Sequence, residues 1–317
     1  MQSNNIIPIV LIADKNYVMP VCVLLQSLYY NKNEISLYDI YVITDDIDKD
    51  SVSTIKQMSK ENFNINVIEV DNKYKDLVNK NRTVTNAAFL KFDIASVVSK
   101  YDKVLYLDVD TIVLKDLSEL YNTDLQETYC GVVEDYHLVR FADMNKKLSL
   151  KHYFNSGVLL LNTKKIREEN LCSKMLKTYI DNGANFYHHD QDVLNLVFND
   201  NITILHPKYN WMISNLDYPQ LMVEKFYKIS RQEHQINKLG IIHYVRLKPW
   251  DYSSVLYQQI WQKYYNLCNF EEKLTLKTCI LMNIYYFLRG RLMLKKINKF
   301  FAQLKQEKKE AKHADQS

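Results

Sequence analysis

The chain has 317 residues, 47% of them hydrophobic, and a formal net charge of +4. A chain of this length and apolar content can bury a large core, as one large or two small domains, and is not disordered. Acidic and basic residues are interspersed along most of its length, so we expect no nucleic-acid partner.

The cysteines and the N-terminus bear on the cellular compartment. The five cysteines are widely spaced and form no CxxC pair, so a disulfide framework or a zinc cluster is not expected and a reducing cytosol fits best. No basic residue precedes the apolar run that begins at Ile6, and Asp14 interrupts that run too early for a signal sequence or a spanning helix. We therefore expect a cytoplasmic protein.

The first part of the chain alternates between strand and helix patterns. Residues 6–13, 37–44 and 65–70 are apolar runs typical of strands buried on both faces, whereas residues 19–30 and 51–61 have apolar positions at helical spacing. This β-α-β-α-β order predicts an α/β fold with a mainly parallel, doubly wound central sheet flanked by helices.

The same alternation continues without a recognisable linker. We expect a helix over residues 89–99 and a strand over residues 103–107. Further along we expect strands in CGVVED (130–135) and FNSGVLLLN (154–162), a helix over residues 164–182, a helix beginning at HHDQDVLN (188–195), and a late strand in IIHYVRLKPW (241–250).

The character of the chain changes at about Lys273. Apolar residues recur at roughly helical spacing with basic residues among them: Ile284, Phe287, Leu288, Arg289, Arg291, Leu292, Lys295, Lys296, Ile297, Lys299, Phe300 and Phe301. A basic amphipathic helix that lies on an anionic membrane surface has this pattern, and so does an ordinary packed terminal helix with a solvated basic face. We expect a main domain over residues 1–270 and a basic amphipathic helical region over residues 271–317.

An acidic pair follows the strand predicted at residues 103–107. Asp108 and Asp110 are two residues apart, so both carboxylates can point to the same side of an extended segment. They also lie at the carboxyl end of the strand, where open α/β sheets bind ligands. Two carboxylates on one side suit Mg²⁺ or Mn²⁺, although acidic pairs at strand ends can also be solvated or cap a helix.

Glycine usage limits how phosphate could be bound. The chain has five glycines, and none of them forms GxGxxG or GxxxxGK[ST]. A nucleotide would therefore need a metal ion and basic side chains to carry its phosphate charge. A divalent ion that bridges diphosphate oxygens stabilises the charge of a departing diphosphate directly.

Three other polar segments each have an ordinary structural explanation. In HHDQD (188–192) an aspartate can cap a helix. NSGV (155–158) places polar groups and a glycine on an interior strand, where backbone or ligand approaches closely or a bulge forms. His243 at a strand end can be a structural histidine, and Lys248 before a proline can be a surface lysine.

Taken together and in order, five segments resemble glycosyltransferase family 8. The family includes bacterial lipooligosaccharide galactosyl- and glucosyltransferases and, more distantly, glycogenin. The resemblance covers roughly residues 7–250 and implies a GT-A nucleotide-diphospho-sugar transferase fold and a metal-dependent hexosyltransferase that retains the anomeric configuration. Its segments are IVLIADKNYVMPVCVLLQSL, KVLYLDVDTIVLKDLSEL, YFNSGVLLLNTKKI, HHDQDVLN and IIHYVRLKPW.

The resemblance assigns a metal and diphosphate site. It implies that Asp108 and Asp110, a DxD motif, bind Mn²⁺ or Mg²⁺ with His243 as the third protein ligand. Lys248 matches the lysine that reaches the diphosphate, and Lys91 stands where the family usually has arginine. The family's usual loop is HxxGxxKPW, whereas HYVRLKPW is one residue shorter and has Arg246 in place of a glycine-containing turn.

The resemblance also assigns the rest of the donor site. The segment that holds uracil and ribose is matched by Ala13, Asp14 and Asn16. The positions that the family uses around the donor sugar are matched by Asp135, Asn155, Asp190 and Gln191. Retention can arise by front-side attack within an ion pair or by a covalent double displacement. An amide is a poor nucleophile, so Gln191 favours the front-side route.

These residues imply the transfer of galactose or glucose from a UDP-sugar to a bacterial glycan or glycolipid acceptor such as lipopolysaccharide. Contact of residues 271–317 with the inner face of the cell membrane would bring the enzyme to lipid-linked acceptors. Three alternatives remain at this stage: a transferase that glycosylates a protein or itself, as glycogenin does; a nucleotide-sugar-binding module without turnover; and a purely structural role for all the polar clusters, as caps and bulges.

Overall fold

The computed structural model describes residues 6–77, 86–182, 186–251, 255–268 and 270. The chain divides into two compact units, one of Met1–Arg246 with Gln259–Glu272 and one of Leu247–Gln258 with the C-terminal region. The basic amphipathic helix expected over residues 271–317 lies outside the described residues. No helix among the described residues is long and apolar enough to cross a membrane.

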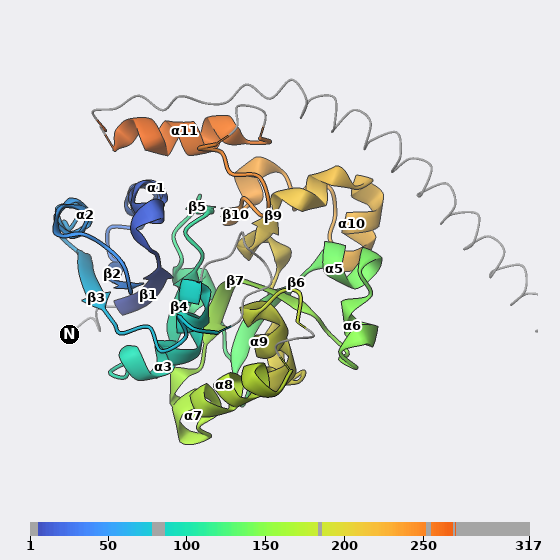
Figure 1. Cartoon of the computed structure of the whole chain (residues 1–317). Helices are drawn as coiled ribbons and strands as arrows, with labels where there is room; N and C mark the ends of the chain where they lie inside the picture. Colours follow the sequence, from blue (N-terminus) through green and yellow to red (C-terminus); the bar gives the residue numbers. More distant parts are fainter. Residues whose placement is uncertain (1–5, 78–85, 183–185, 252–254, 269, 271–317) are drawn as a thin grey trace, which may run out of the picture. The chain divides into compact units, whose positions relative to one another are not determined.

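A seven-stranded sheet lies at the centre of the first unit (Figure 1). Its order is β3-β2-β1-β4-β7-β6-β8. Strands β3, β2, β1 and β4 run parallel, β7 runs antiparallel to both β4 and β6, and β8 runs parallel to β6. The strands are β1 (Ile6–Ile12), β2 (Leu37–Thr44), β3 (Phe63–Glu69), β4 (Val104–Leu107), β6 (Cys130–Glu134), β7 (Phe154–Leu161) and β8 (Ile202–Ile204). The predicted mainly parallel sheet is confirmed, and β7 is a reversed strand within it.

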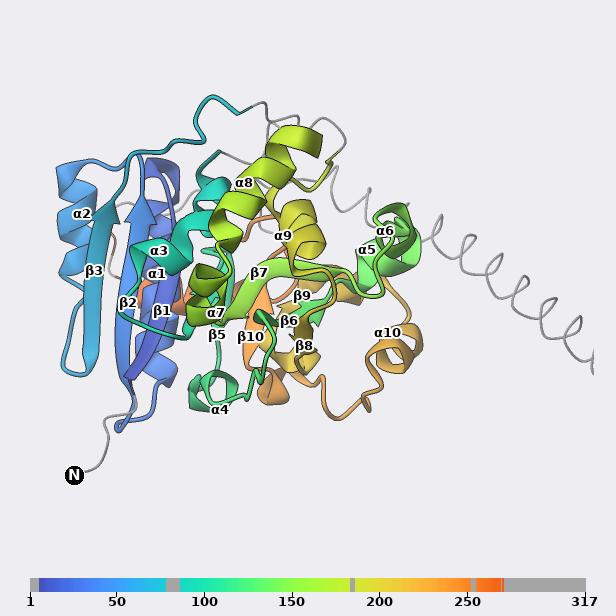
Figure 2. The same ribbon diagram turned by 90° about the horizontal axis from the view of Figure 1, so that it is seen from below.

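Both faces of the sheet are covered, which is why its strands are apolar throughout rather than alternating. In β1, Ile9 and Leu11 point into one core cluster, and Val10 and Ile12 point into the other. The first cluster includes side chains of α1 (Val18–Asn31) and α2 (Lys49–Lys56). The second includes side chains of α3 (Ile94–Val97), α7 (Thr163–Glu168), α8 (Leu171–Asn182) and α9 (Asp190–Phe198). Figure 1 places these four helices on the opposite side of the sheet from α1, and Figure 2 views the molecule from their side.

A small second sheet joins distant parts of the chain. It has the order β5-β10-β9, made of β5 (Thr111–Val113), β10 (Ile241–His243) and β9 (Trp211–Met212). In the antiparallel pairing of β5 with β10, His243 lies opposite Thr111. The main-chain N–H of Tyr244 also donates to the carbonyl of Asp110 over 2.9 Å. This sheet therefore brings the end of β10 beside the segment that follows β4.

Three predicted helices differ from the observed ones. The helix predicted over residues 164–182 is divided into α7 and α8 by Asn170, whose φ of 52° is left-handed, a conformation that asparagine tolerates better than most residues. The helix predicted over residues 89–99 is mostly a 3-10 helix, η2 (Asn86–Asp93), followed by the short α3. Helix α2 ends at Lys56, before the predicted end at residue 61.

The other helices of the described ranges are short. They are α4 (Ser118–Tyr121), α5 (Tyr136–Phe141), α6 (Met144–Lys147), α10 (Gln220–Tyr227) and α11 (Gln258–Leu267), with 3-10 turns η1 (Lys15–Tyr17), η4 (Pro207–Tyr209), η5 (Ile213–Asp217) and η6 (Ile236–Lys238).

Candidate active site

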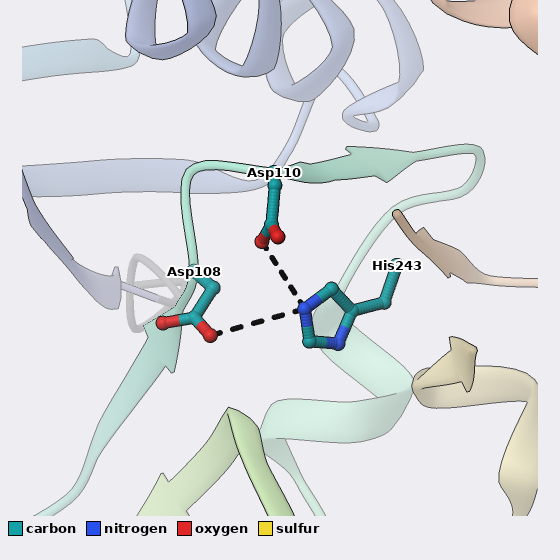
Figure 3. A group of neighbouring side chains, drawn as sticks. All are labelled: Asp108, Asp110 and His243. Atoms are coloured by element: carbon teal, nitrogen blue, oxygen red, sulfur yellow. Dashed lines mark ion pairs between the residues drawn. The ribbon is translucent and has the colours of Figure 1, made fainter. Parts of the chain in front are cut away.

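Two carboxylates and an imidazole converge at the end of β4. Asp108 and Asp110 follow this strand, and His243 ends β10 (Figure 3). One ligand atom from each of the three lies within 4.8 Å of the others. The Nε2 atom of His243 is 3.1 Å from Asp110 Oδ1 and 3.8 Å from Asp108 Oδ2. Oxygen and imidazole nitrogen donors gathered around one point fit a divalent ion such as Mn²⁺ or Mg²⁺.

The backbone around Asp108 fixes the direction of its side chain. Its N–H donates to the carbonyl of Gly157 on β7 over 2.7 Å. Its own carbonyl accepts from the N–H of Thr111 at 3.2 Å and from the Thr111 hydroxyl at 2.8 Å. The chain therefore turns sharply between β4 and β5, and the turn holds both aspartates beside β10.

Gly157 is the residue that lets β7 pass close to the metal ligands. A Cβ at this position would lie 2.1 Å from His243 Cε1 and 2.9 Å from Asp108 Oδ2, distances that real Cβ contacts do not show. The pairing of β6 with β7 also shifts register here, because Gly131 lies opposite Leu160 whereas Val133 lies opposite Asn155, so the extra residues are on β7. Both explanations for NSGV therefore apply, since this glycine allows a close approach and also lies in an irregular part of β7.

Lys91 is buried between two carboxylates. Its Nζ lies 3.1 Å from Asp108 Oδ1 and 2.8 Å from Asp190 Oδ2, and the Tyr106 hydroxyl also donates to Asp108 Oδ1 at 2.5 Å. Burial by itself lowers the pKa of Lys91, but Asp108 and Asp190 outweigh it and hold that pKa above its ordinary value. With Asp110 beside His243, the site holds three carboxylates and one ammonium group, and a divalent cation would balance the excess negative charge.

The polar cluster at residues 188–192 does not cap α9. The N-cap residue is His189, whose side chain makes no capping hydrogen bond. Asp190 instead accepts from Lys91 and, at 3.1 Å, from the hydroxyl of Ser156 on β7. Asp192 accepts from the main-chain N–H groups of residues 187 and 188, which precede the helix. The capping explanation is therefore wrong, because these carboxylates turn toward β7 and the preceding loop.

Gln191 and Asn155 contact each other. Gln191 Oε1 accepts from Asn155 Nδ2 at 3.2 Å and from the main-chain N–H of Ser156 at 3.0 Å, while Gln191 Nε2 donates to the Tyr153 hydroxyl at 3.2 Å. Both lone pairs of the Gln191 amide oxygen are thus engaged. The structure brings Asn155, Asp190 and Gln191 together around β7 and the start of α9, as expected for one site.

Asp135 lies at the end of β6 and caps α5. Its Oδ1 atom accepts from the N–H of Leu138 at 3.0 Å. Burial raises the pKa of the Asp135 carboxyl, and the bond from Leu138, the charge of His188 and a hydrogen bond from Asn155 oppose that rise only in part. Asp135 is therefore a carboxyl group that is costly to ionise.

The residues expected to hold the nucleoside lie at the end of β1. Asp14 is buried and its Oδ1 accepts from the N–H of Asn16 at 2.8 Å, while the Asn16 side chain is exposed. The N–H of Ala13 donates to the carbonyl of Ile43 at 3.1 Å. Because β1 pairs in parallel with β4, this segment and Asp108 share one edge of the sheet.

The loop after β10 crosses from one unit to the other. Arg246 has a φ of 76°, in the left-handed region that favours glycine, which agrees with its place in a turn that usually contains glycine. Its guanidinium donates to His137 Nε2 at 2.7 Å. Lys248 belongs to the second unit, where its carbonyl accepts from the N–H of Asp251 at 3.1 Å. Its expected diphosphate contact therefore stays a prediction.

Three residues of the site carried no sequence signal. Tyr106 lies inside the apolar run of β4, Tyr153 precedes β7, and Asn210 lies between η4 and β9 without any motif around it. Tyr106 contacts Asp108 two residues along the chain, whereas Tyr153 and Asn210 reach predicted site residues only through the fold.

The fold is of the GT-A class. The galactosyltransferase LgtC, solved with donor and acceptor sugar analogues, matches this structure with a TM-score of 0.74 at 21% identity over 84% of this chain and 98% of LgtC. The model of glycosyl transferase family 8 matches residues 8–254. The chain belongs to this family.

Relatives with curated names are similar in sequence as well. Glycosyltransferase GlyF of Streptococcus pneumoniae is 27% identical over 82% of this chain. The lipopolysaccharide 1,2-glucosyltransferase of Escherichia coli is 26% identical over 78% of this chain and 75% of its own length. The chain spans 61% of the length of GlyF and 34% of that of GlyA, a second pneumococcal glycosyltransferase.

Proposed function

We propose that the protein is a metal-dependent retaining hexosyltransferase. It moves galactose or glucose from a UDP-sugar to a bacterial surface glycan acceptor such as lipopolysaccharide or lipooligosaccharide. The observation that carries this proposal is the cluster of Asp108, Asp110 and His243 at the end of β4. Support for the substrates comes from the family and from relatives named for glucosyl and galactosyl transfer.

The cluster would hold Mn²⁺, or Mg²⁺ in its place. When bound, the ion neutralises the charge that develops on the departing UDP. Asp108 and Asp110 bring carboxylate oxygens, and His243 brings Nε2. Lys248 supplies a further positive charge to the diphosphate, and Ala13, Asp14 and Asn16 hold the uridine.

The sugar would lie beside β7 and the start of α9. In this proposal Asn155, Asp190 and Gln191 contact the donor sugar, and Asp135 contacts it from the end of β6. Because Gln191 Oε1 already accepts two hydrogen bonds, it is poorly placed to form a covalent bond to the anomeric carbon. This supports front-side attack, in which a diphosphate oxygen takes the acceptor proton.

Residues 1–270 would form the catalytic domain, and residues 271–317 would attach it to the inner face of the cell membrane. The basic amphipathic pattern of the C-terminal region supports this proposal. The test is to delete the chain after Phe270 and to fractionate cells. We expect the truncated protein to leave the membrane fraction, and an unchanged distribution would contradict membrane attachment.

Donor hydrolysis tests the transferase proposal. Purified protein is incubated with UDP-galactose, UDP-glucose and their N-acetyl forms, with Mn²⁺, with Mg²⁺ and with chelator, and released UDP is measured. We expect metal-dependent release from one hexose donor. Mass gained by the protein itself during incubation would favour self-glycosylation, and donor binding without turnover over a wide acceptor panel would favour a binding module.

A further inference from the structure

Asn210 connects the metal ligand His243 to the residues on β7. It is completely buried. Its Oδ1 atom lies 2.9 Å from His243 Nδ1, and its Nδ2 atom lies 2.9 Å from Asn155 Oδ1. Asn210 therefore has one polar partner on each side of its amide, and both partners are buried.

Main-chain donors fix the orientation of the amides in this group. The N–H of Gly157 donates to Asn155 Oδ1 at 2.9 Å, and the N–H of Ser156 donates to Gln191 Oε1 at 3.0 Å. A main-chain N–H can only donate, so these two side-chain atoms are oxygens. Asn155 Oδ1 then needs the NH₂ group of Asn210 on its other side, and the Asn210 oxygen must face His243.

This orientation decides which nitrogen of His243 carries the proton. The Asn210 oxygen can only accept, so the Nδ1 atom of His243 donates to it. The lone pair of the neutral imidazole is then on Nε2, the atom that faces Asp108 and Asp110. A partner of this kind on the far nitrogen is the usual means of orienting a histidine ligand.

The same bonds continue to Gln191 and beyond. Asn155 Nδ2 donates to Gln191 Oε1 at 3.2 Å, Gln191 Nε2 donates to the Tyr153 hydroxyl at 3.2 Å, and this hydroxyl donates to Asp192 Oδ1 at 2.5 Å. Together with the two bonds of Asn210, the donors all point one way, from His243 to a carboxylate. Turning any one amide would place two donors or two acceptors against each other.

We propose that Asn210 is a positioning residue that holds His243 Nε2 toward the metal and sets the orientation of Asn155 and Gln191 at the same time. The inference deepens the proposed function and depends on the metal site assigned there. It predicts that removing the Asn210 amide weakens metal binding without touching a metal ligand. It also predicts that the two roles can be separated. A side chain at position 210 that accepts from His243 Nδ1 but cannot donate to Asn155 Oδ1 should keep the first role and lose the second.

Mn²⁺ titration of metal-free full-length protein, read by the electron paramagnetic resonance of free Mn²⁺, tests the first role. We expect Asn210→Leu to weaken Mn²⁺ binding by about 10–100-fold. Asn210→Asp keeps an oxygen against His243 Nδ1, so its Mn²⁺ affinity should stay within about threefold of wild type. Its kcat for UDP release should fall, because Asn155 loses a donor.

Asn195→Leu is the matched control. Asn195 is also buried, but its hydrogen bonds go to the main chain of Phe154 on β7 and to the carbonyl of Gln191 rather than to a metal ligand. We expect its Mn²⁺ affinity to equal that of wild type even though the melting temperature falls. If Asn210→Leu does not fold, Asn210→Ser, which is too short to reach both partners, takes its place with the same expected loss.

Two results would overturn the inference. One is wild-type Mn²⁺ affinity in Asn210→Leu or Asn210→Ser, and the other is an equal loss in these variants and in Asn195→Leu. Failure of the wild-type protein to bind Mn²⁺ would have a different meaning, because it would refute the metal site on which the inference depends.

Discussion

Gly157→Ala is the smallest change that should disturb the metal ligands. The added methyl group would lie 2.1 Å from His243 Cε1, which is 1.3 Å short of the 3.4 Å at which ordinary contact begins. The imidazole is held at Nδ1 by its hydrogen bond with Asn210, so a movement away from the methyl group would disturb that bond. Overpacking of this kind costs about 1–3 kcal/mol of folding stability.

The displaced imidazole should bind the metal poorly. We expect the Mn²⁺ affinity of Gly157→Ala to fall by about 10–100-fold, the range found when the support of a histidine ligand is removed. Calorimetric titration with Mn²⁺ measures this change, and thermal unfolding measures the loss of stability.

Gly131→Ala supplies the control for the Gly157 prediction. Gly131 lies on the neighbouring strand β6, and its new methyl group would meet the ends of the Leu125 and Leu205 side chains at 3.1 and 3.2 Å, which can adjust. Its Mn²⁺ affinity should stay at the wild-type value. Equal Mn²⁺ affinities in Gly157→Ala, Gly131→Ala and wild type would refute the argument that β7 must pass this close to His243.

Three further changes test other parts of the site. Lys91→Met leaves two carboxylates without their cation, so urea unfolding should show a loss of about 3–5 kcal/mol. Lys177→Met, in an ion pair with Asp181 whose side chains are both exposed, should lose at most about 1 kcal/mol. Equal losses would contradict a buried charge cluster. Asp135 has a raised pKa in the folded protein, so ionisation of its carboxyl lowers the free energy of unfolding as the pH rises from its ordinary pKa to its folded pKa. Asp135→Asn keeps the cap, so in urea unfolding at several pH values its free energy of unfolding should rise relative to that of wild type over this window. A difference that does not depend on pH would be inconsistent with this. Tyr153→Phe removes the hydroxyl that accepts from Gln191. We therefore expect a lower kcat for UDP release and, in urea unfolding, a free energy of unfolding lower by about 1–3 kcal/mol. Wild-type values of both quantities would show that this hydroxyl has no orienting role.

The strands were predictable wherever they are buried on both faces. Residues 37–44 match β2, and the runs at residues 6–13 and 65–70 match β1 and β3 closely, because a strand covered on both faces must be continuously apolar. The direction of β7 was not predictable. An apolar strand has the same pattern in either direction, and β7 is set by its pairing with both β4 and β6.

The site was only partly predictable from the residues themselves. The spacing of Asp108 and Asp110 at a strand end indicated a metal pair, since such a pair can lie on one side of an extended segment, but in the structure a turn between β4 and β5 brings the two together. The role of His243 came from resemblance alone, because the pairing of β10 with β5 that brings it there is long-range. Asn210 gave no signal, since its two partners are distant in sequence and meet it only in the folded protein.

UDP binding with and without metal tests the central claim most directly. The wild-type protein is titrated with UDP in the calorimeter in the presence of Mn²⁺ and then in the presence of chelator, and Asp110→Ala is titrated under the same two conditions. The account predicts that UDP binds tightly only to the wild-type protein with Mn²⁺, because the ion carries the diphosphate charge. Equal UDP affinity with Mn²⁺ and with chelator, or full Mn²⁺-dependent binding in Asp110→Ala, would contradict the assignment of Asp108, Asp110 and His243 as the metal site.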